Sequence, residues 1–146
     1  MNRLILPFCI LFLHACSSNQ ESNFAKIENF IQHHGITEPL SKFKKLIIIN
    51  DKGTCIQCNN DFSKMISTNL NDKTTLFIIS QDGTKVNISA FLDSKNSENL
   101  ILDFKEEFSK LNIVDGCAII EIKEESLGEK TIINTQNIKN YQSLYN

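Results

Sequence analysis

Continuous apolar runs and segments of helical periodicity alternate along the central part of the chain. Residues 46–49 and 76–79 are uninterrupted apolar runs, the pattern of strands that are buried on both faces of a sheet. Between these runs, Phe62, Met65 and Ile66 recur at the spacing of one helix face. A strand, a helix and a second strand in this order predict a βαβ unit with parallel strands.

Shorter patterns predict further elements on either side of this unit. They are a helix over 24–31 that stops near Gly35, a short helix or irregular crossover over 86–93, a brief strand over 99–103, a helix over 104–110, strands over 117–122 and 131–133, and a weak helix from Asn137. The last two strands, joined by the charged segment 123–130, predict an antiparallel hairpin with a loop there. Together the elements predict an α/β fold in which helices cover a mixed sheet.

The beginning of the chain has a different pattern. Arg3 supplies a positive charge, residues 4–13 form an apolar run interrupted only by Pro7, and the small residue Ala15 follows. This order is typical of a secretory signal. The apolar run is too short to cross a bilayer as a helix, which needs about 20 apolar residues.

Leu13, Ala15 and Cys16 resemble the bacterial lipobox, from which His14 departs. The resemblance implies a lipoprotein signal peptide at 1–15, a lipidated tether at 16–22 that begins with acylated Cys16, and one domain at 23–146. It also implies a lipid-anchored, extracytoplasmic protein of the bacterial cell envelope, facing the periplasm or the cell surface. Several acyl chains would anchor it stably, whereas one holds only marginally. The alternatives are a plain secretory signal with an incidental Cys16, or a buried helix.

Composition and charge narrow the function classes. The 146 residues are 41% hydrophobic and 22% charged, which fits one modest globular domain rather than a disordered chain. The 15 Lys and Arg residues against 17 Asp and Glu residues give a formal net charge of -2. This balance excludes a strongly basic nucleic-acid binder, so no nucleic-acid partner is expected.

The five cysteines are the informative excess in so short a chain. Cys9 would leave with the signal peptide and Cys16 would carry lipid, so three thiols remain: Cys55, Cys58 and Cys117. A C-x-x-C pair binds zinc or exchanges disulfides. A structural zinc site needs four ligands and a second C-x-x-C is missing. The pair follows a buried strand and opens a helix, and this context favours redox chemistry.

The physical reason is the electrostatics of a helix start. Cys55 would lie where unpaired N–H groups and the helix dipole favour negative charge, which stabilises the reactive thiolate. Cys58, one turn further along, can attack the mixed disulfide that Cys55 forms and release the partner. The spacing therefore suits both attack and resolution.

Residues 46–133 resemble the small thioredoxin-like lipoproteins of Bacteroidetes-type bacteria. The resemblance rests on LIIIN, CIQC, TTLFIIS, LILDFKEEFSKLNIVDG and the final hairpin. It implies a thioredoxin-like three-layer α/β/α fold with a mixed central sheet, and a thiol–disulfide oxidoreductase that needs no cofactor. In this family Cys55 would be the nucleophile, Cys58 the resolving thiol, and protein disulfides or an unknown protein the partners.

Three departures from the thioredoxin pattern bear on this interpretation. Ile56 and Gln57 separate the cysteines where Gly-Pro is usual, and Ile49 stands where thioredoxin has a buried carboxylate, with Asp51 nearby in the turn. Cys117 aligns with the proline that is cis in this family. It could be a small buried hydrophobe, an accessory redox thiol, or a ligand of a thiophilic metal beside the C-x-x-C pair.

Competing interpretations remain for the other candidates. Cys55 and Cys58 could form a static disulfide, or the domain could be a non-catalytic binding lipoprotein, with metal bound through these two thiols and Cys117. His33 and His34 are interpreted as a solvated helix end, with metal binding as the alternative, and no dedicated metal site is predicted. Most phenylalanines are expected to fill the core: Phe24, Phe30, Phe43, Phe62, Phe77, Phe91, Phe104 and Phe108.

Overall fold

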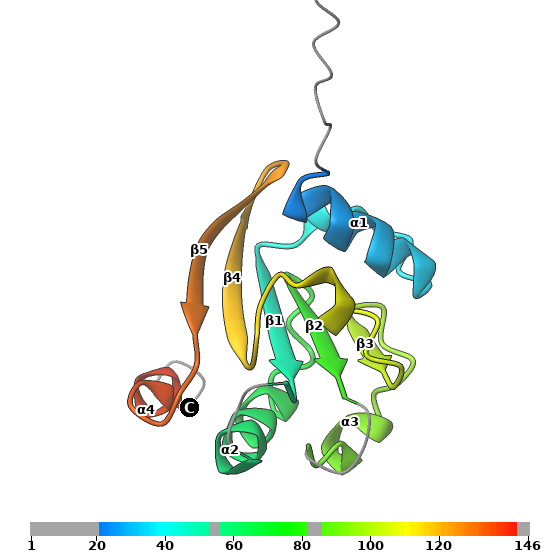
Figure 1. Cartoon of the computed structure of the whole chain (residues 1–146). Helices are drawn as coiled ribbons and strands as arrows, with labels where there is room; N and C mark the ends of the chain where they lie inside the picture. Colours follow the sequence, from blue (N-terminus) through cyan, green and yellow to red (C-terminus); the bar gives the residue numbers. More distant parts are fainter. Residues whose placement is uncertain (1–20, 53–55, 82–85, 143–146) are drawn as a thin grey trace, which may run out of the picture.

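A five-stranded mixed sheet forms the centre of the protein (Figure 1). The computed structural model describes residues 21–52, 56–81 and 86–142. The strands are β1 (Lys45–Asn50), β2 (Thr75–Ser80), β3 (Leu100–Asp103), β4 (Ala118–Lys123) and β5 (Ser126–Ile132). Their order is β3-β2-β1-β4-β5, in which β1, β2 and β3 are parallel whereas β4 and β5 run antiparallel to their neighbours.

Helices cover both faces of this sheet. They are α1 (Asn23–His33), α2 (Ile56–Ser67), α3 (Ser89–Leu92) and α4 (Ile138–Gln142), with short 3-10 helices η1 (Leu40–Lys42) and η2 (Ser109–Leu111). Figure 1 shows α1 on one side of the sheet and α2, α3 and α4 on the opposite side. The predicted α/β/α architecture with a mixed central sheet is confirmed. Within the described ranges, every helix is too short or too polar to cross a membrane.

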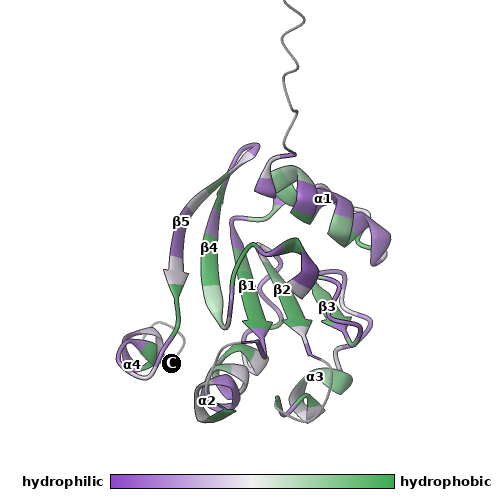
Figure 2. Ribbon diagram, viewed as in Figure 1, coloured by the Kyte–Doolittle hydropathy of each residue, from purple (hydrophilic) through white to green (hydrophobic). Residues whose placement is uncertain are grey.

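The three layers follow from the burial of β1 and β2 on both faces. Successive strand residues point to opposite faces, so Ile48 and Ile78 pack with α1 in one apolar cluster while Ile47 and Ile49 pack with α2 in the other. Figure 2 shows hydrophobic residues concentrated on β1, β2 and β4, whereas β5 is largely hydrophilic. Each fully buried isoleucine contributes about 1.5–3 kcal/mol.

Helix α1 begins and ends at capping residues. The Ser22 hydroxyl accepts a hydrogen bond from the backbone N–H of Ala25, at 3.1 Å. At the other end Gly35 adopts a φ of 85°, and the N–H of Ile36 donates to the carbonyl of Ile31 at 3.0 Å. This pattern is a Schellman motif, in which glycine accepts the left-handed conformation without strain. The helix end expected near Gly35 is therefore confirmed.

The helix predicted over 104–110 is wrong: turns followed by η2 occupy this segment. The Asp103 carboxylate accepts hydrogen bonds from the backbone N–H groups of Lys105 (3.1 Å) and Phe108 (2.9 Å), and Glu106 has a φ of 52°. A side chain that binds nearby backbone amides competes with the helical ladder. Phe104 in this loop is 53% exposed, so its expected place in the core is also wrong.

The loop predicted over 123–130 is much shorter than expected. Strand β4 ends at Lys123 and β5 begins at Ser126, so only two residues connect the strands. Glu124, with a φ of 53°, provides the left-handed conformation that tight hairpin turns require. Of the charges that suggested a loop, Lys123 ends β4, Glu124 and Glu125 form the turn, and Glu129 and Lys130 are exposed residues of β5. Gly128 also lies inside β5.

We expect Asp103→Asn to lower the free energy of unfolding by about 2–3 kcal/mol at neutral pH. The amide oxygen of Asn can take the place of Oδ2 and accept from Phe108 and Ser80, but its NH2 group then faces the Lys105 N–H, which donates to Oδ1 of Asp103. Burial raises the pKa of Asp103, but hydrogen bonds from the Phe108 backbone and from Ser80 outweigh it, so the pKa lies below its usual value.

The sign of the pH dependence follows from this lowered pKa. The contribution of Asp103 is complete above its unfolded pKa of about 3.9 and is lost as pH falls through the lower folded value. Urea unfolding of the wild type and of Asp103→Asn over this pH range measures the contribution of Asp103. The control is Asp93→Asn at an exposed position, which should change the free energy of unfolding by no more than about 0.5 kcal/mol. A gap between wild type and Asp103→Asn that stays constant down to about pH 2 would contradict the assignment.

Candidate functional site

The carboxyl end of β1 leads into the helix in which the sequence places the C-x-x-C pair. In open α/β sheets, ligands and reacting groups lie beyond this end of the parallel strands. Helix α2 follows β1 there and begins at Ile56, between the two cysteines of the C-x-x-C pair. Figure 1 shows α2 close to the tip of the β1 arrow. The strand-to-helix context predicted for the pair is therefore present.

The two cysteines themselves differ in what the structure describes. Cys58 lies in the first turn of α2, although its side chain, like all of Cys55, falls outside the described part of the chain. Cys16 and the predicted signal peptide also lie outside it. The first turn of α2 contains no acidic residue. No carboxylate in that turn therefore competes for the N–H groups that would stabilise a thiolate.

Cys117 lies directly before β4, next to the end of β1. The register pairs Ala118 with Ile48, and the carbonyl of Cys117 accepts a 2.8 Å hydrogen bond from the N–H of Ile133. The side chain is 0% exposed and belongs to the apolar cluster on the α2 face of the sheet. Its thiol donates to Oδ1 of Asn59, with 3.2 Å between sulfur and oxygen. Because Asn59 follows Cys58, one side chain links Cys117 to the first turns of α2.

A buried carboxylate lies close to the C-x-x-C pair in sequence. Asp51 immediately follows β1, is 3% exposed, and donates its backbone N–H to the carbonyl of Ser80. In thioredoxins the buried carboxylate stands at the position of Ile49, and Asp51 was expected nearby in the turn. The structure buries Asp51 two residues further along, four residues before Cys55, which makes it a candidate proton acceptor.

A chain of buried polar side chains fixes the same end of the sheet. The Ser109 hydroxyl donates to Oδ1 of Asn50 at 3.0 Å and lies 3.2 Å from the hydroxyl of Ser80. Ser80 in turn donates to Asp103 at 2.8 Å, while the amide of Asn50 donates to the carbonyl of Val114 at 3.1 Å. These bonds join the ends of β1, β2 and β3 to the segment before β4.

Sequence reasoning missed three features of this protein. The hydrogen bond from Cys117 to Asn59 has no local signal, because the two residues are 58 positions apart. The interpretation of His33 and His34 as a solvated end holds for only one of them, since the side chain of His33 is 78% exposed and that of His34 only 18%. Glu107, which falls in the segment predicted to be a helix over 104–110, lies in a loop beside both rings.

Comparison with protein-family models, with curated proteins and with solved structures finds no match. The resemblance to thioredoxin-like lipoproteins therefore rests on the motifs quoted above alone. Function is therefore inferred from the fold, from the position of the C-x-x-C pair and from the chemistry of its neighbours.

Proposed function

We propose that the chain is a lipid-anchored, extracytoplasmic thiol–disulfide oxidoreductase of thioredoxin-like type. The observation that carries the proposal is the start of α2 at Ile56, inside the C-x-x-C pair and directly beyond the buried strand β1. A cysteine at such a start has a stabilised thiolate, and the thiolate is the nucleophile of disulfide exchange. A second cysteine in the first turn of the same helix provides the resolving thiol.

The proposed reaction has two exchange steps. The Cys55 thiolate attacks one sulfur of a partner disulfide, so a Cys55–partner disulfide forms, the partner disulfide breaks and one partner thiolate leaves. Cys58, once deprotonated, attacks the Cys55 sulfur, which releases the second partner thiolate and forms the Cys55–Cys58 disulfide. Two electrons pass from the dithiol to the partner, and an external thiol donor restores the dithiol. Asp51 is the candidate acceptor of the Cys58 proton.

The alternative function is a non-catalytic binding lipoprotein that holds a thiophilic metal through Cys55, Cys58 and Cys117. The hydrogen bond from Cys117 to Asn59 weighs against this alternative. This contact gives the buried sulfur a polar partner within the protein, so a metal is not needed to account for its position. Full burial of the same side chain also suits a small packed residue. These observations favour the two-cysteine reaction without Cys117 as a ligand.

We expect the Cys58→Ser variant to lose catalytic turnover and to remain bound to its substrate as a mixed disulfide. Without the resolving thiol, the mixed disulfide through Cys55 persists, so the variant forms a covalent adduct with insulin, used as a model disulfide protein. Non-reducing electrophoresis and peptide mass spectrometry identify the adduct and its cysteine. Insulin reduction by this variant is expected to stop after about one equivalent.

Two matched variants show which cysteine forms the adduct. Cys55→Ser/Cys58→Ser should form no adduct, whereas Cys58→Ser/Cys117→Ser should form as much as Cys58→Ser alone, because Cys117 is buried. Absence of adduct in the folded Cys58→Ser protein would refute the oxidoreductase proposal. An adduct that forms only when Cys117 is present would identify Cys117, and not Cys55, as the nucleophile.

The lipid anchor is tested separately. Palmitate labelling of cells that express the full chain should mark the wild-type protein and leave Cys16→Ala unlabelled, because acylation requires the Cys16 sulfur. Cys9→Ala is the matched control within the predicted signal peptide, and it should label like wild type. Equal labelling of the Cys16→Ala protein would rule out lipidation at that residue.

A further inference from the structure

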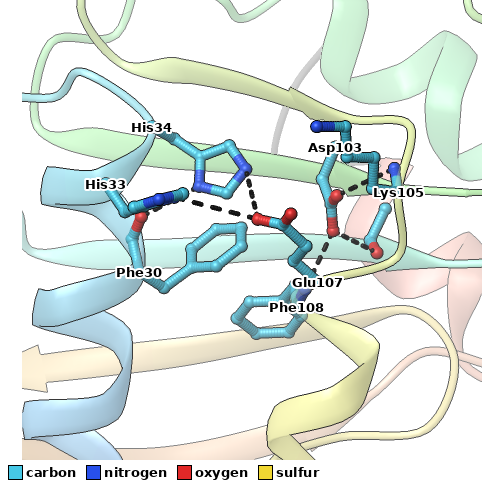
Figure 3. A network of polar contacts seen from close by, with 8 residues as sticks. Phe30, His33, His34, Asp103, Lys105, Glu107 and Phe108 are labelled. Atoms are coloured by element: carbon cyan, nitrogen blue, oxygen red, sulfur yellow. Dashed lines mark hydrogen bonds and ion pairs between the residues drawn. The ribbon is translucent and has the colours of Figure 1, made fainter.

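Three metal-ligating side chains meet between the end of α1 and the loop that follows β3. One ring nitrogen of His33, one ring nitrogen of His34 and a carboxylate oxygen of Glu107 all lie within 4.8 Å of one another. Figure 3 shows both imidazole rings directed toward the Glu107 carboxylate. This cluster belongs to the α1 face of the sheet, whereas α2 packs on the opposite face. It is therefore independent of the C-x-x-C chemistry.

The separations suit a shared ion better than direct hydrogen bonds. Glu107 Oε2 lies 3.5 Å from Nε2 of His34 and 3.8 Å from Nδ1 of His33. A direct N–H···O hydrogen bond spans about 2.7–3.2 Å. Ligands around a tetrahedral zinc ion, with bonds of about 2.0–2.2 Å, are separated by roughly 3.3–3.6 Å. The two nitrogen–oxygen separations are therefore within a few tenths of an ångström of this range, and the ligand atoms of the two histidines lie within 4.8 Å of each other.

The hydrogen bond of His34 to the backbone leaves its Nε2 atom available to bind a metal. Its Nδ1 lies 3.0 Å from the carbonyl oxygen of Phe30. A carbonyl only accepts, so Nδ1 carries the hydrogen, and the lone pair of a neutral ring is on Nε2, which faces Glu107. A lone pair that faces a carboxylate oxygen is repelled by it, so a cation between the two, either a proton on the ring or a metal, stabilises this arrangement. A ligand histidine that donates its other N–H to a backbone carbonyl is the usual arrangement at zinc sites.

Packing holds both sides of the cluster in place. The Phe30 ring stacks on His34 with 4.2 Å between centroids and contacts Phe108 edge-on at 5.3 Å. Phe108 follows Glu107, and its N–H is bound by the Asp103 carboxylate. The Schellman motif at Gly35 fixes the point at which α1 ends. Preorganised ligands lose less conformational entropy when they bind an ion.

The surroundings favour a cation and leave room for a further ligand. The C-terminus of α1 carries the negative end of the helix dipole, which adds to the charge of Glu107. A pocket of about 310 Å³ adjoins the cluster and is lined also by Leu102, Asp103, Phe104 and Lys105. Three protein ligands with an open fourth position are typical of zinc sites at which water or a substrate group completes the coordination.

We propose that His33, His34 and Glu107 form a Zn²⁺ site that clips the end of α1 to the loop after β3. Two imidazole nitrogens and one carboxylate oxygen are a ligand set that zinc accepts in tetrahedral geometry. The two histidines come from the end of one helix and the glutamate from a loop 73 positions after His34 in the sequence, so binding ties α1 to the sheet edge. Zinc then stabilises the folded state, because the unfolded chain does not bring the three ligands together.

Zinc titration of the full chain tests the site, in a Cys55→Ser/Cys58→Ser background that removes the two thiols of the C-x-x-C pair. We expect one zinc ion per chain with half-saturation at or below ~10 µM, measured by competition with a zinc indicator. His34→Gln and Glu107→Gln should each weaken binding at least ~10-fold. Glu125→Gln, which removes an equal charge from an exposed turn residue, should bind zinc like the parent protein.

A second measurement guards against variants that bind less because they fold less well. In ¹H–¹⁵N spectra of the ring nitrogens, one equivalent of zinc should shift Nε2 of His34 and Nδ1 of His33 and leave the protonated Nδ1 of His34 in place. Half-saturation above ~10 µM, equal binding by the Glu107→Gln variant, or unchanged ring resonances would each overturn the proposal. In those cases the cluster is an ordinary ion pair between a protonated histidine and Glu107.

Discussion

The burial of β1 and β2 on both faces is the constraint on which the rest of the structure depends. Parallel strands need crossover connections, and strands that are apolar on both faces need cover on both. Helix α2 meets both needs at once, because it connects β1 to β2 and packs on one face. The same connection places the C-x-x-C pair beyond the tip of β1, so the position of the proposed chemistry follows from the packing of the sheet.

The polar groups at that end of the sheet are as buried as the apolar core. Asn50, Ser80 and Asp103 close the three parallel strands, and each is at most 2% exposed. Buried polar groups are costly unless they are hydrogen-bonded, and here they bond to one another and to the backbone of the loop after β3. Asp103 thereby shapes the loop that carries Glu107. One network supports the end of the sheet beside the C-x-x-C pair and the proposed zinc site on the other face.

Local sequence patterns predicted the elements that depend on apolar burial. The runs at 46–49 and 76–79 became β1 and β2, and the helical face of Phe62 and Ile66 became the buried side of α2. The failures lie where a side chain from elsewhere, or a single backbone angle, decides the structure. The apolar spacing of Phe104 and Phe108 suggested a helix, but backbone N–H groups of that segment donate hydrogen bonds to the Asp103 carboxylate instead.

At the two candidate sites, local spacing could likewise be predicted from the sequence, whereas contacts between distant segments could not. A spacing of two residues between cysteines is visible in the sequence, and its place at a strand-to-helix junction followed from the flanking patterns. The meeting of His34 with Glu107, and that of Cys117 with Asn59, depends on how distant segments fold together. Periodicity reports which face of an element is buried, but it does not report which residues of two loops share a pocket.

An equilibrium redox titration of the Cys55–Cys58 pair against reduced and oxidised glutathione tests the central claim most directly. Thiol alkylation followed by mass spectrometry gives the fraction of oxidised pair at each ratio in the folded protein. An oxidoreductase predicts a reversible two-electron transition within the range that glutathione can reach, as for known exchange catalysts at about -120 to -270 mV. A pair that stays oxidised at every ratio until the protein unfolds would be a structural disulfide, and the proposed activity would be contradicted.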